Sequence, residues 1–380
     1  MGKNGNGEGS IYEHKRNGKK VGYRGAYTVY TAEGPTRRYV TGKTRDEVRQ
    51  KLTKVMADRD GGLVFDAGSL TVGEYLERWL KDSVKGTVRQ STYEVYGHMI
   101  RPHIVPGLGR VKLKSLTPAH VRSFYRDRLD ANLSSATVHK MHVVLHKALD
   151  QAVSDGLIPR NAAKGVKVPQ TKKKEIQPLT PEQAQALLEA ARGDRLEALY
   201  VLALNTGLRQ GELLALKWED VELEEAILRV RLTLTRTGGK VTLGPPKTNK
   251  SRRSVRLTGG AVAALQSHLS RQLEEMEWLG SLYRPGGLVF ANEAGGIINP
   301  SNLRNRSFAR LLKRASLPAD TRFHDLRHTC ATLLLSRNVN PKIVSEMLGH
   351  SSISITLDTY SHVLPTMQQS AVSALEDTLR

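Results

Sequence analysis

The chain has 380 residues, and its 58 lysines and arginines against 37 aspartates and glutamates give a formal net charge of +21 at pH 7. This length predicts two or three domains, and the charge favours a polyanionic partner. Because the sequence has no apolar run of 18 residues, no apolar leader and only one cysteine, Cys330, we expect a cytoplasmic protein without a membrane partner or a disulfide framework.

Residues 1–65 are expected to form a small domain. The pattern predicts three strands, from Ser10, over 21–30 and over 37–41, and then a helix over 44–60 that opens on a capping box. The segment holds 14 basic and 7 acidic side chains, and a basic sheet of this kind can enter the major groove of DNA. The candidate DNA contacts are Arg24, Arg37 and Arg38. The alternative is a module for protein contacts.

Residues 66–165 are expected to be entirely helical. The apolar periodicity predicts helices over 71–80, 91–100, 117–129 and 134–154, with Pro102 and Pro106 separating the second from the third. The candidate phosphate contacts here are Arg89, Lys140 and Lys147. For any one of them taken alone, a solvated surface charge is the favoured interpretation.

Residues 166–178 have no apolar periodicity and predict an extended basic linker. Its candidate DNA contacts are Lys172, Lys173 and Lys174, although a simple flexible connector fits the composition equally well. A further domain over 179–380 then opens at Thr180, which is followed by Pro181 and by Gln183 as in a capping box.

Two segments of this last domain carry charged side chains at defined positions. Gly207 interrupts an apolar helix, and a second amphipathic helix is expected from about Arg209, where Glu212 lies three residues on and can hold the guanidinium. Lys247 lies between the runs 227–234 and 254–257, which predicts the tip of a hairpin or of a three-stranded sheet. A mobile lysine there can protonate a leaving 5′-oxygen.

The stretch 322–360 carries the remaining reactive groups. His324 and Arg327 share one face of a predicted helix, His350 follows the helix C-cap Gly349, and Tyr360 lies ten residues after that histidine. Arginines stabilise the charge of a pentacoordinate phosphate, histidines move protons, and a tyrosine hydroxyl can attack phosphorus.

A zinc site on the first helix of this stretch is the competing interpretation. His324 and His328 have the i, i+4 spacing of a zinc pair, but that motif places a glutamate after the first histidine and here Asp325 follows. Arg327 would also stand beside the metal as an uncompensated cation. We therefore expect no metal at this position.

The motifs TGLRQGE, PPKT, HDLRH and LGH, followed by Tyr360, resemble those of tyrosine recombinases, the phage-integrase family, over 179–360. The resemblance implies six catalytic residues. Arg209 and Arg327 would clamp the phosphate, Lys247 would act as general acid, His324 and His350 would be the two family histidines, and Tyr360 would be the nucleophile. Glu212 supports the site, and no cofactor is implied.

The resemblance extends to architecture and function. It implies a multi-domain fold: a small N-terminal three-stranded β-sheet plus helix for arm-type DNA sites (1–65), an all-α core-binding domain (66–165), and a mainly α catalytic domain with a small antiparallel β-sheet (179–380). The implied activity is DNA integration or excision of a phage or mobile element in a bacterial cell, through a 3′-phosphotyrosine, by a homotetramer with host DNA-bending or directionality factors. The alternatives are a type IB topoisomerase and a DNA-binding regulator without catalysis.

Overall fold

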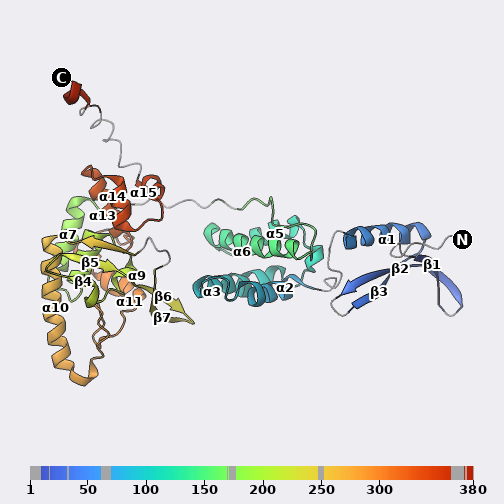
Figure 1. Ribbon diagram of the computed structural model, residues 1–380, viewed down its shortest axis with the longest axis horizontal. Coiled ribbons are helices and arrows are strands. Elements are labelled where there is room, and N and C mark those ends of the chain that lie inside the picture. Colours follow the sequence, from blue (N-terminus) through green and yellow to red (C-terminus); the bar gives the residue numbers. More distant parts are fainter. Residues whose placement is uncertain are drawn as a thin grey trace. The chain divides into compact units, whose positions relative to one another are not determined.

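The computed structural model describes residues 10–16, 18–31, 34–60, 70–168, 170, 177–246, 252–360, 372 and 375–379. The chain divides into two compact units, Met1–Lys173 and Lys174–Arg380 (Figure 1).

The first unit begins with an antiparallel sheet in the order β1-β2-β3, whose strands are Ser10–Arg16, Lys19–Thr31 and Gly34–Gly42. Helix α1 (Arg45–Asp60) lies across this sheet (Figure 1). Buried Val48 and Leu52 on α1 pack toward Tyr27 and its neighbours, because these apolar side chains recur on one face of the helix. The predicted order of three strands and a helix is confirmed.

The rest of the first unit is helical. Its α-helices are α2 (Val72–Arg78), α3 (Gln90–Met99), α4 (Val105–Leu108), α5 (Pro118–Asp130) and α6 (Ser135–Ser154), and it also contains π-helical stretches over Trp79–Val84 and Ile100–Ile104 and a 3₁₀ turn over Leu113–Ser115. The predicted capping box at Thr71 and Glu74 is present at the start of α2. The apolar face of α6 contributes Val138, Met141 and Leu145 to the core between the helices.

The predicted separation of the helices over 91–100 and 117–129 is present, but it begins at Gly109 and not at Pro102. The helical backbone continues through Pro102 as the π-helical stretch Ile100–Ile104 and runs directly into α4, where Pro106 occupies the first turn. A wide π turn tolerates a residue that donates no backbone hydrogen bond. Ile100 and Ile104 are fully buried, so core packing holds the segment helical.

The second unit is mainly helical. Its helices are α7 (Pro181–Ala191), α8 (Glu197–Thr206), α9 (Gln210–Leu213), α10 (Gly259–Leu279), α11 (Pro300–Asn302), α12 (Ala309–Arg314), α13 (Asp325–Ser336), α14 (Pro341–Leu348) and α15 (Ile353–Tyr360), with a π-helical stretch over Leu303–Phe308 and 3₁₀ turns over Trp218–Asp220 and Gly280–Leu282. The capping box predicted at Thr180 and Gln183 opens α7. Helix α8 is central to the core, since Leu199, Tyr200 and Leu202 are fully buried. Helices α13, α14 and α15 lie together (Figure 1).

The strands of this unit form two small antiparallel sheets. The first has the order β4-β5-β8, with strands Val221–Glu222, Ile227–Val230 and Arg253–Arg256, and the second pairs β6 (Thr233–Thr237) with β7 (Lys240–Gly244). The run 227–234 is thus divided between two sheets, which the sequence pattern did not predict. Lys247, expected at the hairpin tip, lies outside the described residues. The fold class predicted from the sequence is confirmed.

Two helices of the second unit end at glycines in the left-handed conformation. Gly207 (φ +60°) ends α8 and Gly349 (φ +69°) ends α14, as predicted for Gly349. A Cβ at Gly207 would lie 2.5 Å from Cδ2 of Leu348, so the position requires glycine for both conformation and space. The amphipathic helix expected from Arg209 is short, because α9 ends at Leu213. The residues that follow leave the helix, and Leu214 and Leu216 are buried in the core.

None of the helices in the described part of the chain has the length and hydropathy needed to span a bilayer.

Candidate active site

The two left-handed glycines each present a carbonyl oxygen to an arginine. Arg327 donates from Nη1 to the oxygen of Gly207 at 2.8 Å, and Arg209 donates from Nη2 toward the oxygen of Gly349 at 3.4 Å. A left-handed C-cap turns the chain away from the helix axis. These turns therefore bring the two guanidinium groups from separate helices to the same region.

A buried carboxylate orients Arg209. Glu212 accepts the backbone N–H of Arg209 at 2.9 Å and pairs with its Nη1 at 2.9 Å. Oε2 of Glu212, which accepts that backbone N–H, also accepts from Nη2 of Arg253 at 2.9 Å, and Arg253 Nε donates to the oxygen of Met347 at 2.6 Å. Burial acts to raise the pKa of Glu212, but hydrogen bonds and charge from Arg253 and Arg209 outweigh it and hold that pKa below its usual range. The carboxylate therefore stays ionised and fixes both arginines.

Arg327 is buried, with 3% of its surface exposed. Its Nη2 has no hydrogen-bond partner among the described residues. Burial and the nearby charge of Arg209 lower the pKa of Arg327 to about 9, so the side chain remains a cation at neutral pH. A buried cationic donor without a partner is costly, and an anion at this position would satisfy it.

Two histidines lie at the start of α13. His324 is the N-cap of α13, and its ring meets that of His328 edge-on with centroids 5.0 Å apart. Nδ1 of His328 forms a hydrogen bond with Oη of Tyr360 at 2.8 Å. Tyr360, the last residue of α15, is buried between α13 and α14 beside Ala331 and Leu348. Burial raises the pKa of Tyr360 to about 12.

His350 follows directly after the α14 C-cap. Its Nδ1 forms a hydrogen bond with Oγ1 of Thr356 at 2.7 Å, so Nε2 is the ring nitrogen left for another group. Burial, Arg327 and Arg209 lower the pKa of His350 to about 4, and burial, Arg327 and Arg209 also lower the pKa of His324. Both imidazoles are therefore neutral near pH 7 and suited to hydrogen bonding with a phosphate.

The structure places five of the six predicted catalytic residues in one cluster, joined by hydrogen bonds and by mutual electrostatic effects: Arg209, His324, Arg327, His350 and Tyr360. The predicted support of Arg209 by Glu212 is present. Lys247 lies outside the described residues. The arrangement gathers two cations, neutral imidazoles and a phenol around one unpaired buried donor.

Three residues of the cluster were not singled out from the sequence: Arg253, His328 as the partner of Tyr360, and Thr356. A signal existed for Arg253, since it shares the inward face of β8 with buried Val255, and an inward arginine requires a buried carboxylate. Thr356 carried no such signal.

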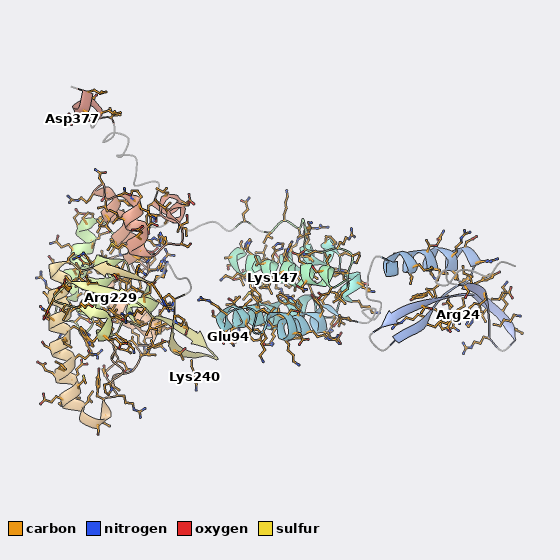
Figure 2. The ribbon with its side chains drawn as sticks, viewed as in Figure 1. Arg24, Glu94, Lys147, Arg229, Lys240 and Asp377 are labelled. Atoms are coloured by element: carbon orange, nitrogen blue, oxygen red, sulfur yellow. The ribbon has the colours of Figure 1, made fainter. Side chains whose placement is uncertain are left out.

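The predicted DNA contacts of the first unit stay predictions. Figure 2 labels Arg24 in the N-terminal sheet and Lys147 on α6. Arg24 is half-buried, with its guanidinium 3.9 Å from the ring centre of Tyr39, and Nζ of Lys147 lies 3.5 Å from Oη of Tyr96. Arg37, Arg89 and Lys140 are exposed and Arg38 is half-buried. Lys172, Lys173 and Lys174 lie outside the described residues.

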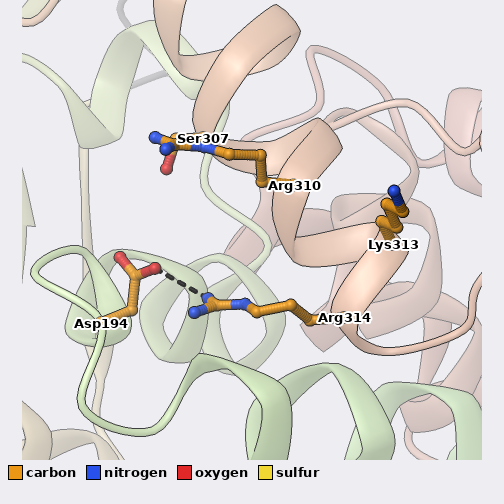
Figure 3. A pocket seen from close by; sticks show the side chains of 5 residues that line it. All are labelled: Asp194, Ser307, Arg310, Lys313 and Arg314. Carbon is orange, nitrogen blue, oxygen red and sulfur yellow. Dashed lines mark hydrogen bonds and ion pairs between the residues drawn. The ribbon is translucent and has the colours of Figure 1, made fainter.

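A separate pocket of about 530 Å³ lies at the other end of α8, between the loop that precedes this helix and α12. Arg310 and Lys313 extend from α12, and Arg314 forms an ion pair with Asp194 at 2.8 Å (Figure 3). None of the clustered catalytic candidates lines it. The pocket is therefore distinct from the candidate active site.

Substituting Gly349 by alanine is expected to destabilise the fold. An alanine Cβ would lie 2.9 Å from Nη1 of Arg253, in a left-handed conformation that alone costs about 1–2 kcal/mol. Displacing Arg253 from buried Glu212 should add about 3 kcal/mol. Gly193→Ala is the control, because Gly193 (φ +72°) has open space around its Cβ position. Urea unfolding of both variants measures the difference, and equal losses would contradict the expectation.

Comparisons with known proteins agree with this geometry. Residues 177–367 match the phage integrase family, and residues 71–129 match the phage integrase N-terminal SAM-like domain. A "Tyrosine recombinase XerC-like" protein of Caldanaerobacter subterraneus is 34% identical, over 95% of this chain and 97% of its own.

Solved structures share the fold. The Tn1549 transposon integrase, in complex with a circular intermediate DNA, superposes with a TM-score of 0.69 at 24% identity, covering 81% of this chain and 100% of its own. A lambda integrase from a tetramer bound to a Holliday junction superposes with a TM-score of 0.57 at 20% identity, covering 92% of this chain and 95% of its own. With a family match over half of the sequence and a relative similar over nearly all of it, this chain belongs to the phage integrase family of tyrosine recombinases.

Proposed function

We propose that this protein is a site-specific DNA recombinase that integrates or excises a phage or mobile element through a covalent bond between Tyr360 and a 3′-phosphate. The observation that carries the proposal is the buried, unpaired Nη2 of Arg327 within the cluster of Arg209, His350 and Tyr360. A DNA phosphate supplies the anion that this donor requires.

The proposed reaction gives each predicted catalytic residue one role. Oη of Tyr360 attacks phosphorus, while Arg209 and Arg327 stabilise the negative charge that builds on the non-bridging oxygens. His324 and His350 donate hydrogen bonds to the same oxygens. Lys247 protonates the departing 5′-oxygen. The phosphotyrosine conserves the energy of the broken ester, so a 5′-hydroxyl of another strand can reverse the step without a cofactor.

The partners follow from the charge of the chain and from its relatives. We propose that residues 66–165 and the catalytic domain bind the core-type site, and that residues 1–65 bind arm-type sites. Joining two duplexes needs four active sites, and the lambda integrase described above assembles as a tetramer on a Holliday junction. A homotetramer on DNA is therefore proposed, acting in the cytoplasm with host DNA-bending or directionality factors.

Incubation of the protein with DNA fragments that flank its own gene tests the function. Denaturing electrophoresis should reveal a covalent adduct on one short segment, and two copies of that segment should recombine. A supercoiled plasmid without the segment should stay supercoiled. Rapid relaxation of that plasmid would favour a type IB topoisomerase, and the absence of any adduct would favour a regulator without catalysis.

The role of Lys247 predicts a rescue experiment. Lys247→Ala should slow cleavage by about 10²–10⁴-fold, the usual contribution of a general acid. A substrate with sulfur at the 5′-bridging position has a leaving group that needs no proton, so the same variant should cleave it nearly as fast as the wild type. Equal defects with oxygen and sulfur substrates would show that this lysine binds phosphate or supports the fold. Single-turnover cleavage measures both.

A further inference from the structure

The nucleophile has a specific hydrogen-bond partner that the family motifs do not assign. Oη of Tyr360 lies 2.8 Å from Nδ1 of His328, and the two ring centroids are 5.8 Å apart. The pairing joins α13 and α15 across 32 residues of sequence. Among the described residues, no other hydrogen bond reaches the Tyr360 hydroxyl. The proton of the nucleophile therefore has one visible acceptor.

The orientation of α13 gives neighbouring residues different tasks. Arg327 donates its hydrogen bond to the oxygen of Gly207, whereas His328, the next residue, meets the rings of Tyr360 and His324. Successive residues of a helix point about 100° apart. One helix turn thus supplies both a phosphate-binding cation and a group that faces the nucleophile.

Burial and nearby charged groups keep the imidazole of His328 neutral. Burial and the neighbouring His324 lower the pKa of His328 to about 4. A neutral imidazole with its proton on Nε2 has a free lone pair on Nδ1, as accepting a phenol proton requires. The titratable and charged groups that act on His328, or on which it acts, come from α13, from the segment before it and from the α14–α15 region: Arg322, His324, Asp325, Arg327, His350 and Tyr360.

Building on the recombinase function proposed above, we propose that His328 is the general base that takes the hydroxyl proton of Tyr360 during strand cleavage. The Oη–P bond forms as the P–O5′ bond breaks, the phenol proton moves to Nδ1 of His328, and the 5′-oxygen leaves with a proton from its own donor. In rejoining, the 5′-hydroxyl attacks phosphorus and gives its proton back to that donor, the Oη–P bond breaks, and His328 returns the other proton to Tyr360. No oxidant, reductant or co-reactant is needed.

The transfer must accompany bond formation. In the free protein the phenol holds its proton more tightly than the imidazole, because burial raises the pKa of Tyr360 and lowers that of His328. As Oη bonds to phosphorus it loses its affinity for the proton, and the anionic phosphate stabilises the imidazolium that forms. The proton therefore moves only when a scissile phosphate occupies the site, which protects the resting enzyme from an ionised nucleophile.

The test compares the wild type with His328→Asn on the DNA segment that the experiment with flanking DNA reveals. The asparagine Oδ1 can replace Nδ1 as a hydrogen-bond acceptor but is far too weak a base to take the phenol proton. The variant therefore keeps the group that orients Tyr360 and loses only the proton transfer. Single-turnover cleavage by the variant should fall by about 10²–10⁴-fold near pH 7. Its rate should then rise about tenfold per pH unit because tyrosine must ionise first, while the wild-type rate stays nearly constant from about pH 6 to about pH 8, below the pKa of Arg327.

A second measurement changes the acidity of the nucleophile. Fluorotyrosine at position 360 is a stronger acid, so it should restore much of the activity of His328→Asn and change the rate of the otherwise wild-type protein only slightly. The comparison of tyrosine with fluorotyrosine in the protein that keeps His328 tests the proposal even if the asparagine variant fails to fold. If the cleavage rate of the protein that keeps His328 rises in proportion to the acidity of the phenol at position 360, the proposal is overturned.

The matched control is His142→Asn. His142 Nδ1 forms a 2.8 Å hydrogen bond with Oη of Tyr125 in the first unit, which repeats the His328–Tyr360 contact away from the candidate site. This variant should keep the wild-type pH profile. A wild-type protein that forms no adduct would defeat the recombinase function itself. Adduct formation with an unchanged pH profile in His328→Asn would defeat only the role of His328.

Discussion

Tyr360→Phe is expected to abolish the covalent protein–DNA adduct and to leave DNA binding within a few-fold of the wild type. The substitution removes only Oη, and the ring keeps its packing against Ala331, Leu335, Val344 and Leu348. Denaturing electrophoresis after incubation with labelled half-site DNA measures the adduct, and a native gel shift measures binding. An adduct that persists in the variant would show that Tyr360 is not the nucleophile.

The same substitution leaves half-buried His328 without its partner, which should cost about 1 kcal/mol of stability. Tyr125→Phe is the matched control, since it removes an equivalent hydrogen bond to His142 elsewhere in the protein. The control should lose stability to a similar degree and still form the adduct. Loss of the adduct in both variants would attribute the effect to destabilisation.

Arg209→Lys is expected to slow cleavage by about two to three orders of magnitude, the typical effect of removing one donor to a developing oxyanion. Arg209 pairs with Glu212 through one terminal nitrogen and approaches the Gly349 oxygen through the other. A lysine ammonium is a single point charge and cannot reproduce this planar arrangement. Single-turnover rates at saturating protein separate this effect from weakened binding.

Arg195→Lys is the control for Arg209→Lys. Arg195 pairs with Glu275 at 2.6 Å and donates to the oxygen of Ala291 at 2.9 Å, so it makes the same kind of contacts outside the catalytic cluster. This variant should lose stability without a specific loss of rate. Excess EDTA should also leave wild-type cleavage intact, because the arginines supply the charge that metal ions supply in other phosphoryl transfers. Arrest of cleavage by chelation would contradict the mechanism.

The parts of the fold that sequence reasoning described correctly depend on residues close together in the chain. The capping boxes at Thr71 and Thr180 and the left-handed C-cap at Gly349 each involve neighbours within about four residues. Backbone geometry alone determines such contacts. The ion pair of Arg209 and Glu212 was predictable for the same reason.

Packing overrode local preference in two places. Pro102 is a helix-breaking signal, yet buried Ile100 and Ile104 keep its segment helical through a π turn. The run 227–234 reads as one strand, but β5 pairs with β4 and β8 while β6 pairs with β7. Strand pairing depends on partners distant in sequence, so the local pattern cannot specify where one sheet ends.

The sequence by itself determined the family, the order of the reactive residues and the local geometry that presents them, because spacing and caps act within a helical turn. Only the tertiary structure decided which groups meet. Arg253 reaches Glu212 across 41 residues, and His328 reaches Tyr360 across 32. Such contacts exist because buried polar atoms must find partners wherever the packed helices bring them, and that placement follows from the whole core of the catalytic unit.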